Sequence, residues 1–191
     1  MVGARLTRVP LRDWAHDLDA MTRIAADIAY LVNPHNPTGT VRSRAEIEHF
    51  AQASPAGLIV VDEAYVEFTD DPDATTCLPL VASGRVAVLR TFSKIYGLAG
   101  LRVGYLIADP GIITTLRKIR APFSVGTLAQ AGALAALGDP GHAAQVRART
   151  LRARAEITRL FEHAGYPVIP SQANFILVQA PDEHKLVSRL A

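Results

Sequence analysis

The chain has 191 residues, of which 49% are hydrophobic and 20% charged, a composition typical of a folded globular protein. Its 20 basic and 18 acidic residues leave a net charge of +2, which argues against a nucleic-acid-binding or membrane-surface protein. Cys77 is the only cysteine, so an internal disulfide is excluded, and no apolar run is long enough to span a bilayer. Because the N-terminus lacks a signal-peptide pattern, a cytoplasmic location is expected.

The first predicted elements are a short helix and a strand. Residues 18–26 place apolar side chains on one helical face, and Asp17 can cap the helix. The brief apolar run 28–32 predicts a buried strand. It leads into residues 33–39, where two X-Pro steps and a glycine exclude regular structure and predict a shaped loop.

A helix and a second strand follow this loop. Residues 43–53 are predicted to be helical because Ser43 and Glu46 have the spacing of a capping box. The apolar residues 58–61 predict another buried strand, which ends at Asp62. The acidic segment of residues 70–73 is expected to form a turn.

Two further strands enclose a segment rich in small and polar residues. Residues 86–90 predict a buried strand, and residues 103–108 predict the next one. The segment between them carries Lys94, hydroxyl side chains, glycines and an arginine. Helices are then predicted at residues 109–120 and 127–137.

The longest predicted helix spans residues 142–164 and stops at Gly165 and Pro167. Its inner face is expected to comprise Val146, Thr150, Ala153, Ile157, Leu160 and Phe161. Its many arginines suggest nucleic acid at first sight. They alternate with alanine and glutamate, however, so a solvated face is the preferred interpretation. Short strands are expected at residues 168–169 and 175–178.

Strands that alternate with helices predict an α/β fold, with a mostly parallel sheet and helices on both of its faces. We expect residues 1–141 to form part of a large domain and residues 142–164 to form a connecting helix. Residues 165–191, where the pattern changes, are interpreted as the start of a smaller α+β domain that is incomplete.

Polar side chains follow three of the predicted strands, namely Asn36, Asp62 and Lys94. Ligands bind at the carboxyl ends of the strands in such sheets, so these side chains are expected to converge on one site. A lysine at the mouth of a buried strand is a candidate amine nucleophile, because desolvation lowers its pKa. Taken alone, a serine-lysine pair in a glycine-rich turn is more often a solvated loop.

The neighbours of Lys94 supply chemistry suited to a phosphate group. Thr91 and Ser93 offer hydroxyl groups, and Arg102 can donate two hydrogen bonds to one phosphate. A lysine combined with a phosphate-binding cluster suggests pyridoxal phosphate, whose aldehyde a lysine captures as a Schiff base.

Such a cofactor needs further partners. Asp62 suits the pyridine nitrogen, although an aspartate at a strand end is also a common turn or helix cap. Asn36 and Tyr65 can donate hydrogen bonds to the 3-oxygen of the ring. The other two lysines, Lys118 and Lys185, lie on predicted helices away from the strand ends.

Four ordered motifs carry a resemblance to a known family. They are Asn33-Pro-His-Asn-Pro-Thr-Gly39, Asp62-Glu-Ala-Tyr65, Thr91-Phe-Ser-Lys94 and Gly97-Leu-Ala-Gly-Leu-Arg-Val-Gly-Tyr105. Together they resemble the fold-type I pyridoxal-phosphate aminotransferases, most of all histidinol-phosphate aminotransferase and its aromatic-aminotransferase relatives. Ser171-Gln-Ala-Asn-Phe175 resembles a strand of the family's small domain.

The resemblance implies a set of cofactor-binding residues, with Lys94 as the Schiff-base lysine. The set is Asn36, Asp62, Tyr65, Thr91, Ser93, Lys94 and Arg102. Asn174 is implied to line the substrate cleft, and no metal site is expected. The resemblance also implies a homodimer. Because family members are longer, we expect a chain truncated at both ends, without the ring-stacking aromatic residue and the carboxylate-binding arginine.

The implied activity is transfer of an amino group between histidinol phosphate or an aromatic amino acid and 2-oxoglutarate or glutamate. Two alternatives keep the fold: a truncated, non-catalytic cofactor-binding remnant, or another fold-type I enzyme such as a decarboxylase or lyase. A nucleic-acid-binding role for the basic helix is disfavoured, since the net charge is small and no aromatic side chains are interleaved.

Overall fold

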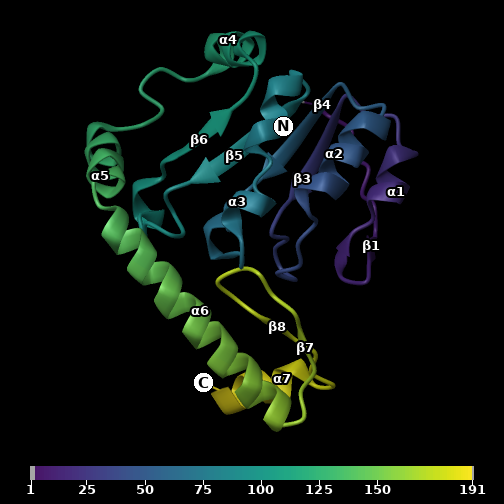
Figure 1. The fold of residues 1–191 in the computed structure, drawn as a ribbon, viewed down its shortest axis with the longest axis vertical. Coiled ribbons are helices and arrows are strands. Elements are labelled where there is room, and N and C mark those ends of the chain that lie inside the picture. The colour runs from purple at the N-terminus through teal and green to yellow at the C-terminus, as the bar shows by residue number, and fades with distance from the viewer. Residues whose placement is uncertain (1–2, 191) are drawn as a thin grey trace.

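A computed structural model describes residues 3–190, and the chain is organised around a four-stranded sheet in the order β3-β4-β5-β6 (Figure 1). The strands are β3 (Ile28–Val32), β4 (Leu58–Asp62), β5 (Val86–Thr91) and β6 (Gly104–Ile107). The first three strands run parallel, whereas β6 is antiparallel to β5. The predicted α/β fold with a mostly parallel sheet is confirmed; the reversed direction of β6 was not predicted.

The main hydrophobic core lies where α1 (Leu18–Thr22) and α2 (Arg44–Ala53) pack against the sheet. The Ser43 side chain accepts from the Glu46 amide, and the Glu46 carboxylate accepts from the Ser43 amide, so the predicted capping box is confirmed. The predicted Asp17 cap is also present, but α1 ends earlier than residue 26. The largest buried core side chains are Leu31, Ile47, Phe50, Ile59, Val61, Val86 and Val88.

Short helical turns connect these elements. The acidic cluster that was expected to be a turn begins a one-turn helix, α3 (Pro72–Thr75), because Asp71 accepts a hydrogen bond from the Ala74 amide. Three 3-10 helices complete this part of the chain: η1 (Val66–Phe68), η2 (Leu78–Ser83) and η3 (Ala99–Leu101).

The chain beyond the sheet is mainly helical (Figure 1). Its helices are α4 (Pro110–Ile119), α5 (Thr127–Leu137), α6 (Pro140–His163) and α7 (Glu183–Leu190). α6 begins two residues earlier than predicted, because Asp139 caps it and Pro140 fits its first turn. Two antiparallel pairs of short strands remain, β1 (Leu11–Arg12) with β2 (Ala15–His16), and β7 (Val168–Ile169) with β8 (Leu177–Val178).

The face that α6 turns toward the rest of the chain matches the predicted one only in part. Val146, Thr150 and Phe161 are partly buried, and Val146 packs against a buried cluster that includes Tyr65 and Phe68. Ala153, Ile157 and Leu160, expected on the inner face, are exposed. Arg147 and Arg154 also donate hydrogen bonds at 2.6 to 3.1 Å to backbone carbonyls of η1 and of the two residues that follow it. The long arginine side chain reaches carbonyls that a short apolar side chain cannot. The interpretation of all these arginines as a solvated face was therefore wrong for two of them.

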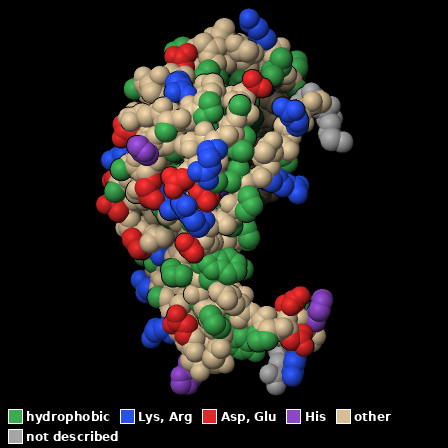
Figure 2. Space-filling view, turned by 90° about the vertical axis from the view of Figure 1, so that its right-hand side faces the viewer, with side chains coloured by type: hydrophobic (Ala, Val, Ile, Leu, Met, Phe, Trp, Pro, Cys, Tyr) green, Lys and Arg blue, Asp and Glu red, His purple; other side chains and the backbone are tan. Residues whose placement is uncertain are grey.

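Figure 2 shows a curved molecule, with a larger lobe, a smaller lobe and a hollow between them. The larger lobe contains the sheet, and the smaller lobe contains β7, β8 and α7, with α6 running between the two (Figure 1). Within residues 3–190, no helix combines the length and the apolar character needed to cross a membrane.

Candidate active site

Polar side chains gather at the carboxyl ends of β4 and β5, where they line an open pocket of about 580 Å³. Five of the predicted site residues line this pocket: Asp62, Thr91, Ser93, Lys94 and Arg102. The two strands are parallel and pair Asp62 in register with Leu89, so the residues that follow both strands emerge at the same edge. The predicted convergence of Asp62 and Lys94 is therefore found.

Asp62 is held by two hydrogen bonds at the end of β4. The Tyr30 hydroxyl donates to Oδ2 at 2.6 Å, and the Ala64 amide donates to Oδ1 at 3.0 Å. Burial and the hydrogen bond to the Asp62 carboxylate both raise the pKa of Tyr30. The hydrogen bond from the Ala64 amide shows that Asp62 caps a turn, which was the alternative role considered for it from the sequence. The carboxylate oxygens have further lone pairs, so Asp62 can still accept a hydrogen bond from a ligand.

Tyr30 was not predicted as a site residue. It lies in the apolar run of β3 and pairs in register with Val60, which places it diagonally across from Asp62 on the same side of the sheet. The pairing of β3 with β4 is the signal that identifies it. That pairing joins segments about thirty residues apart and cannot be read from local patterns.

Lys94 lies over an aromatic ring. Its Nζ is 5.0 Å from the ring centroid of Tyr65, within the range of a cation–π contact. Tyr65 is buried, and its hydroxyl accepts a hydrogen bond from Asn36 Nδ2 at 3.0 Å. Its ring packs edge-on against that of Phe175, with 5.1 Å between the ring centroids. The structure thus brings Asn36, Tyr65 and Lys94 together, although they come from three different loops.

The hydroxyl groups predicted to hold a phosphate lie next to each other. Thr91 Oγ1 donates to Ser93 Oγ at 2.9 Å and accepts from the Ser93 amide at 3.0 Å, which closes a tight turn after β5. Arg102 lines the same pocket; its backbone has a φ of 53°, and its guanidinium donates to the Ala99 carbonyl at 2.8 Å. Two hydroxyls and a guanidinium on one wall are donors suited to a phosphate.

Asn174 lies apart from this cluster. It is exposed and is not among the residues that line the pocket at β4 and β5. The turn that carries it is nevertheless fixed to the loop of Asn36, because the Gln172 amide donates to the Gly39 carbonyl at 2.7 Å. Gly39 has a φ of +76°, and a side chain there would collide with Ser171.

The whole chain, residues 1–191, matches the family described as aminotransferase class I and II. The chain belongs to this family.

Named relatives add detail. The chain is 49% identical over 184 residues to the aromatic amino acid aminotransferase of Mycobacteroides abscessus, which covers 92% of this chain and 52% of that protein. It is 42% identical to the histidinol-phosphate aminotransferase of Brevibacillus brevis, over 92% of this chain and 50% of that protein. The chain thus spans about half the length of the curated relatives that it matches.

A solved structure shares the fold closely. It is the histidinol-phosphate aminotransferase from Sinorhizobium meliloti in complex with pyridoxal-5'-phosphate, with a TM-score of 0.90 and 35% sequence identity. The superposition covers 98% of this chain and 54% of that one. The predicted fold class and the resemblance stated from the four motifs are confirmed.

Proposed function

We propose that the chain binds pyridoxal phosphate and belongs to an aminotransferase acting on histidinol phosphate or an aromatic amino acid, with 2-oxoglutarate or glutamate as its partner. One observation carries the proposal. An amine, Lys94, shares a single pocket with the carboxylate of Asp62 and with the hydroxyls of Thr91 and Ser93. This set of groups fits a molecule that has an aldehyde, a basic ring nitrogen and a phosphate. The names of the relatives and of the solved structure support the substrate and the cofactor.

Each part of the pocket has a distinct task in this proposal. Pyridoxal phosphate, when bound, supplies an electron-withdrawing ring that stabilises negative charge on the substrate. Lys94 is the amine that holds the aldehyde carbon and, once free, the base whose Nζ moves a proton from the substrate carbon. Asp62 pairs with the ring nitrogen and keeps it protonated.

The remaining residues bind and orient the cofactor. Asn36 and Tyr65, already joined by a hydrogen bond, are assigned to the 3-oxygen of the ring. Thr91, Ser93 and Arg102 are assigned to the phosphate.

The arrangement of the chain extends the proposal to domains and assembly. We propose that residues 1–141 belong to the large domain, residues 142–164 connect it, and residues 165–191 begin the small domain, with Asn174 facing the substrate. A homodimer is proposed from the resemblance to the family, and a cytoplasmic location from the sequence pattern of the N-terminus. Light scattering of the purified chain tests the dimer, since a monomer mass would contradict it.

The cofactor site is tested by absorbance and chemical trapping. The purified chain is titrated with pyridoxal phosphate, reduced with borohydride, digested and analysed by mass spectrometry. The wild type and the control variant Lys118→Ala are expected to show a visible band and a modified peptide that contains Lys94. Lys94→Ala is expected to lose both signals. A modification that disappears only in Lys118→Ala would contradict the assignment.

Turnover is a separate measurement. Histidinol phosphate or phenylalanine is supplied with 2-oxoglutarate, and glutamate is measured. Glutamate formation supports the aminotransferase. Cofactor binding without product favours the non-catalytic alternative, and release of carbon dioxide favours a decarboxylase.

A further inference from the structure

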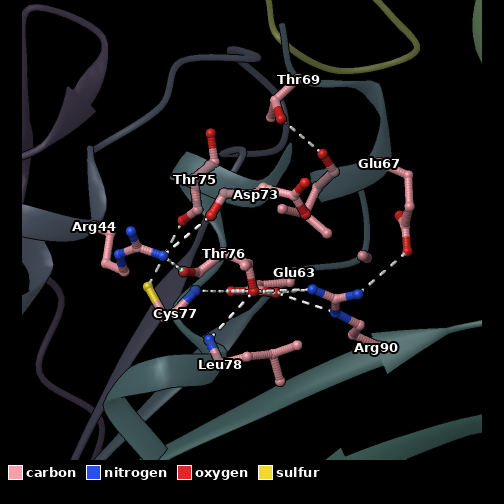
Figure 3. Close-up of polar contacts among 12 residues, drawn as sticks. Arg44, Glu63, Glu67, Thr69, Asp73, Thr75, Thr76, Cys77, Leu78 and Arg90 are labelled. Atoms are coloured by element: carbon pink, nitrogen blue, oxygen red, sulfur yellow. Dashed lines mark hydrogen bonds and ion pairs between the residues drawn. The ribbon is translucent and has the colours of Figure 1, made fainter. Parts of the chain in front are cut away.

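An ion pair between buried Glu63 and partly buried Arg90 joins the ends of β4 and β5 at the candidate site, and Arg90 also lines the pocket (Figure 3). Glu63 is 1% exposed, and its Oε2 accepts hydrogen bonds from Nε and Nη2 of Arg90 at 3.1 and 2.8 Å. Two nitrogens of one guanidinium therefore contact one buried carboxylate. Neither residue was predicted as part of the site, because their side chains meet only once the two strands are paired.

Further hydrogen bonds to Glu63 come from the segment after α3 (Figure 3). Thr76 Oγ1 lies 2.8 Å from Oε2, and the Cys77 amide donates to Oε1. Thr76 Oγ1 also accepts from Arg90 Nη2 at 2.9 Å, so Glu63, Thr76 and Arg90 form a closed set of contacts. Arg44 of α2 fixes the same segment by donating to a backbone carbonyl of α3 at 3.0 Å.

Stability alone is a poor explanation for this pair. Removing a carboxylate and a guanidinium from water is costly, and uncharged side chains of similar volume often give equal or higher stability. Removing only one partner is strongly destabilising, since the other charge then stays buried without a counterion. A role for the Glu63–Arg90 pair therefore follows from the strand ends that it holds together.

Its position connects it with the site. Glu63 directly follows Asp62, and Arg90 directly precedes Thr91. The Glu63 amide donates to the Leu89 carbonyl at 2.9 Å, which continues the β4–β5 ladder beyond its last in-register pair. The ion pair thus links the two strand ends at the residues next to two proposed cofactor contacts.

We propose that Glu63 and Arg90 are positioning residues for pyridoxal phosphate, setting the spacing between the groups at its two ends. This inference rests on the proposed function. Asp62 would meet the ring nitrogen and Thr91 the phosphate, so a small shift between β4 and β5 disturbs both contacts with one rigid molecule. A planar guanidinium held by two nitrogens resists such a shift, whereas an apolar contact has no preferred direction.

The test separates positioning from stability by removing both charges together. In the double variant Glu63→Gln with Arg90→Met, both members of the pair lose their charge together. Glu67, whose Oε1 lies 4.0 Å from Arg90 Nη1, also loses a cationic neighbour, but its side chain is partly exposed to solvent. The introduced carboxamide can still accept from the Cys77 backbone and donate to Thr76. The urea unfolding midpoint is therefore expected to stay at the wild-type value or to rise. The dissociation constant for pyridoxal phosphate, measured by titration of the visible band, is expected to rise at least about tenfold.

Two single variants complete the design. Ile59→Val lowers the stability of the same sheet without touching the strand ends, and its dissociation constant is expected to equal that of the wild type. Arg90→Lys keeps the charge beside Glu63 but loses the two-nitrogen contact. It is expected to fold, to bind more weakly and to shift the visible band of the bound cofactor. If the double variant does not fold, the affinity and the visible band of Arg90→Lys test the positioning role instead.

The wild-type chain distinguishes the two possible failures. If it takes up no pyridoxal phosphate, the proposed function is wrong and the positioning role falls with it. Suppose instead that the wild type and Ile59→Val bind pyridoxal phosphate. If the folded charge variants then show the wild-type dissociation constant and an unchanged visible band, the positioning role is wrong and the proposed function stands.

Discussion

The sheet part (residues 3–107) and the helical part (residues 108–190) of the chain are held together in different ways. In the sheet part, side chains such as Phe50 and Ile59 are fully buried in one continuous core. In the helical part, large apolar side chains such as Leu128 and Leu134 are exposed. α6 contacts the sheet part through arginines that bind backbone carbonyls and through Ala143 and Val146, which pack against a small second core that includes Tyr65 and Phe68. The candidate cofactor residues of β4 and β5 belong to the part with its own core. Changes in the helical part away from Ala143, Val146 and Phe175, which pack near Tyr65, should therefore affect the pocket little.

The largest contrast is expected between two matched truncations. Phe50→Ala leaves a cavity in the core and is expected to lower the free energy of unfolding by about 4 kcal/mol. Leu134→Ala removes a side chain that is 71% exposed and is expected to change it by less than about 0.5 kcal/mol. Urea unfolding measures both. Equal losses would show that the two parts share one core.

The next effect is pH dependence at the junction of β2 and β3. Burial, and then the nearby His35, lower the pKa of His16 to about 4 from an ordinary 6.5. The unfolded chain thus binds a proton more readily, so this contribution to stability is complete above pH 6.5 and is lost as the pH falls to about 4.

The loss from His16 is expected to reach about 3 kcal/mol. Other groups titrate over the same range, so the comparison is with His16→Asn, which should remove this part of the pH dependence. Unfolding by urea at several pH values measures the difference. Parallel curves for the two proteins would contradict the prediction.

A smaller effect is expected at the contact between α6 and the sheet part. Arg154 donates to the carbonyls of Phe68 and Ala173 and to Asp70. Arg154→Ala is expected to cost about 2 kcal/mol, because buried carbonyls lose their donors. Arg152→Ala, on the exposed side of the same helix, should cost almost nothing. Hydrogen exchange should speed up around Ala173 only in the first variant, and equal exchange in both would contradict the assignment.

Local patterns predicted most of the sheet part. The capping box of Ser43 and Glu46 depends on residues three apart, and the strand at residues 58–61 on a short apolar run, so the sequence suffices for both. The motif order also placed Asp62 and Lys94 in one pocket, since parallel strands expose their carboxyl ends at the same edge.

The missed side-chain contacts depend on pairing between distant segments. Glu63 meets Arg90 across two strands, and Tyr30 meets Asp62 across two others. For α6, the periodicity identified the helix and part of its inner face, such as Val146, but not the arginines that bind carbonyls. The carbonyls that bind Arg154 include that of Phe68 in η1, more than eighty residues earlier.

The smallest expected effect lies at the exposed edge of the sheet part. Tyr30→Phe removes the hydroxyl that donates to Asp62 Oδ2 but keeps the ring on β3. Because Tyr30 is half exposed, water can replace the lost donor, and the free energy of unfolding should fall by about 1 kcal/mol or less. If Asp62 holds the ring nitrogen, its looser orientation should also weaken the binding of pyridoxal phosphate a few-fold. Tyr166→Phe, whose ring packs on Phe161 in the smaller lobe, is the control and should leave that affinity unchanged. Equal affinities for the wild type and Tyr30→Phe would show that the Ala64 amide alone orients the carboxylate.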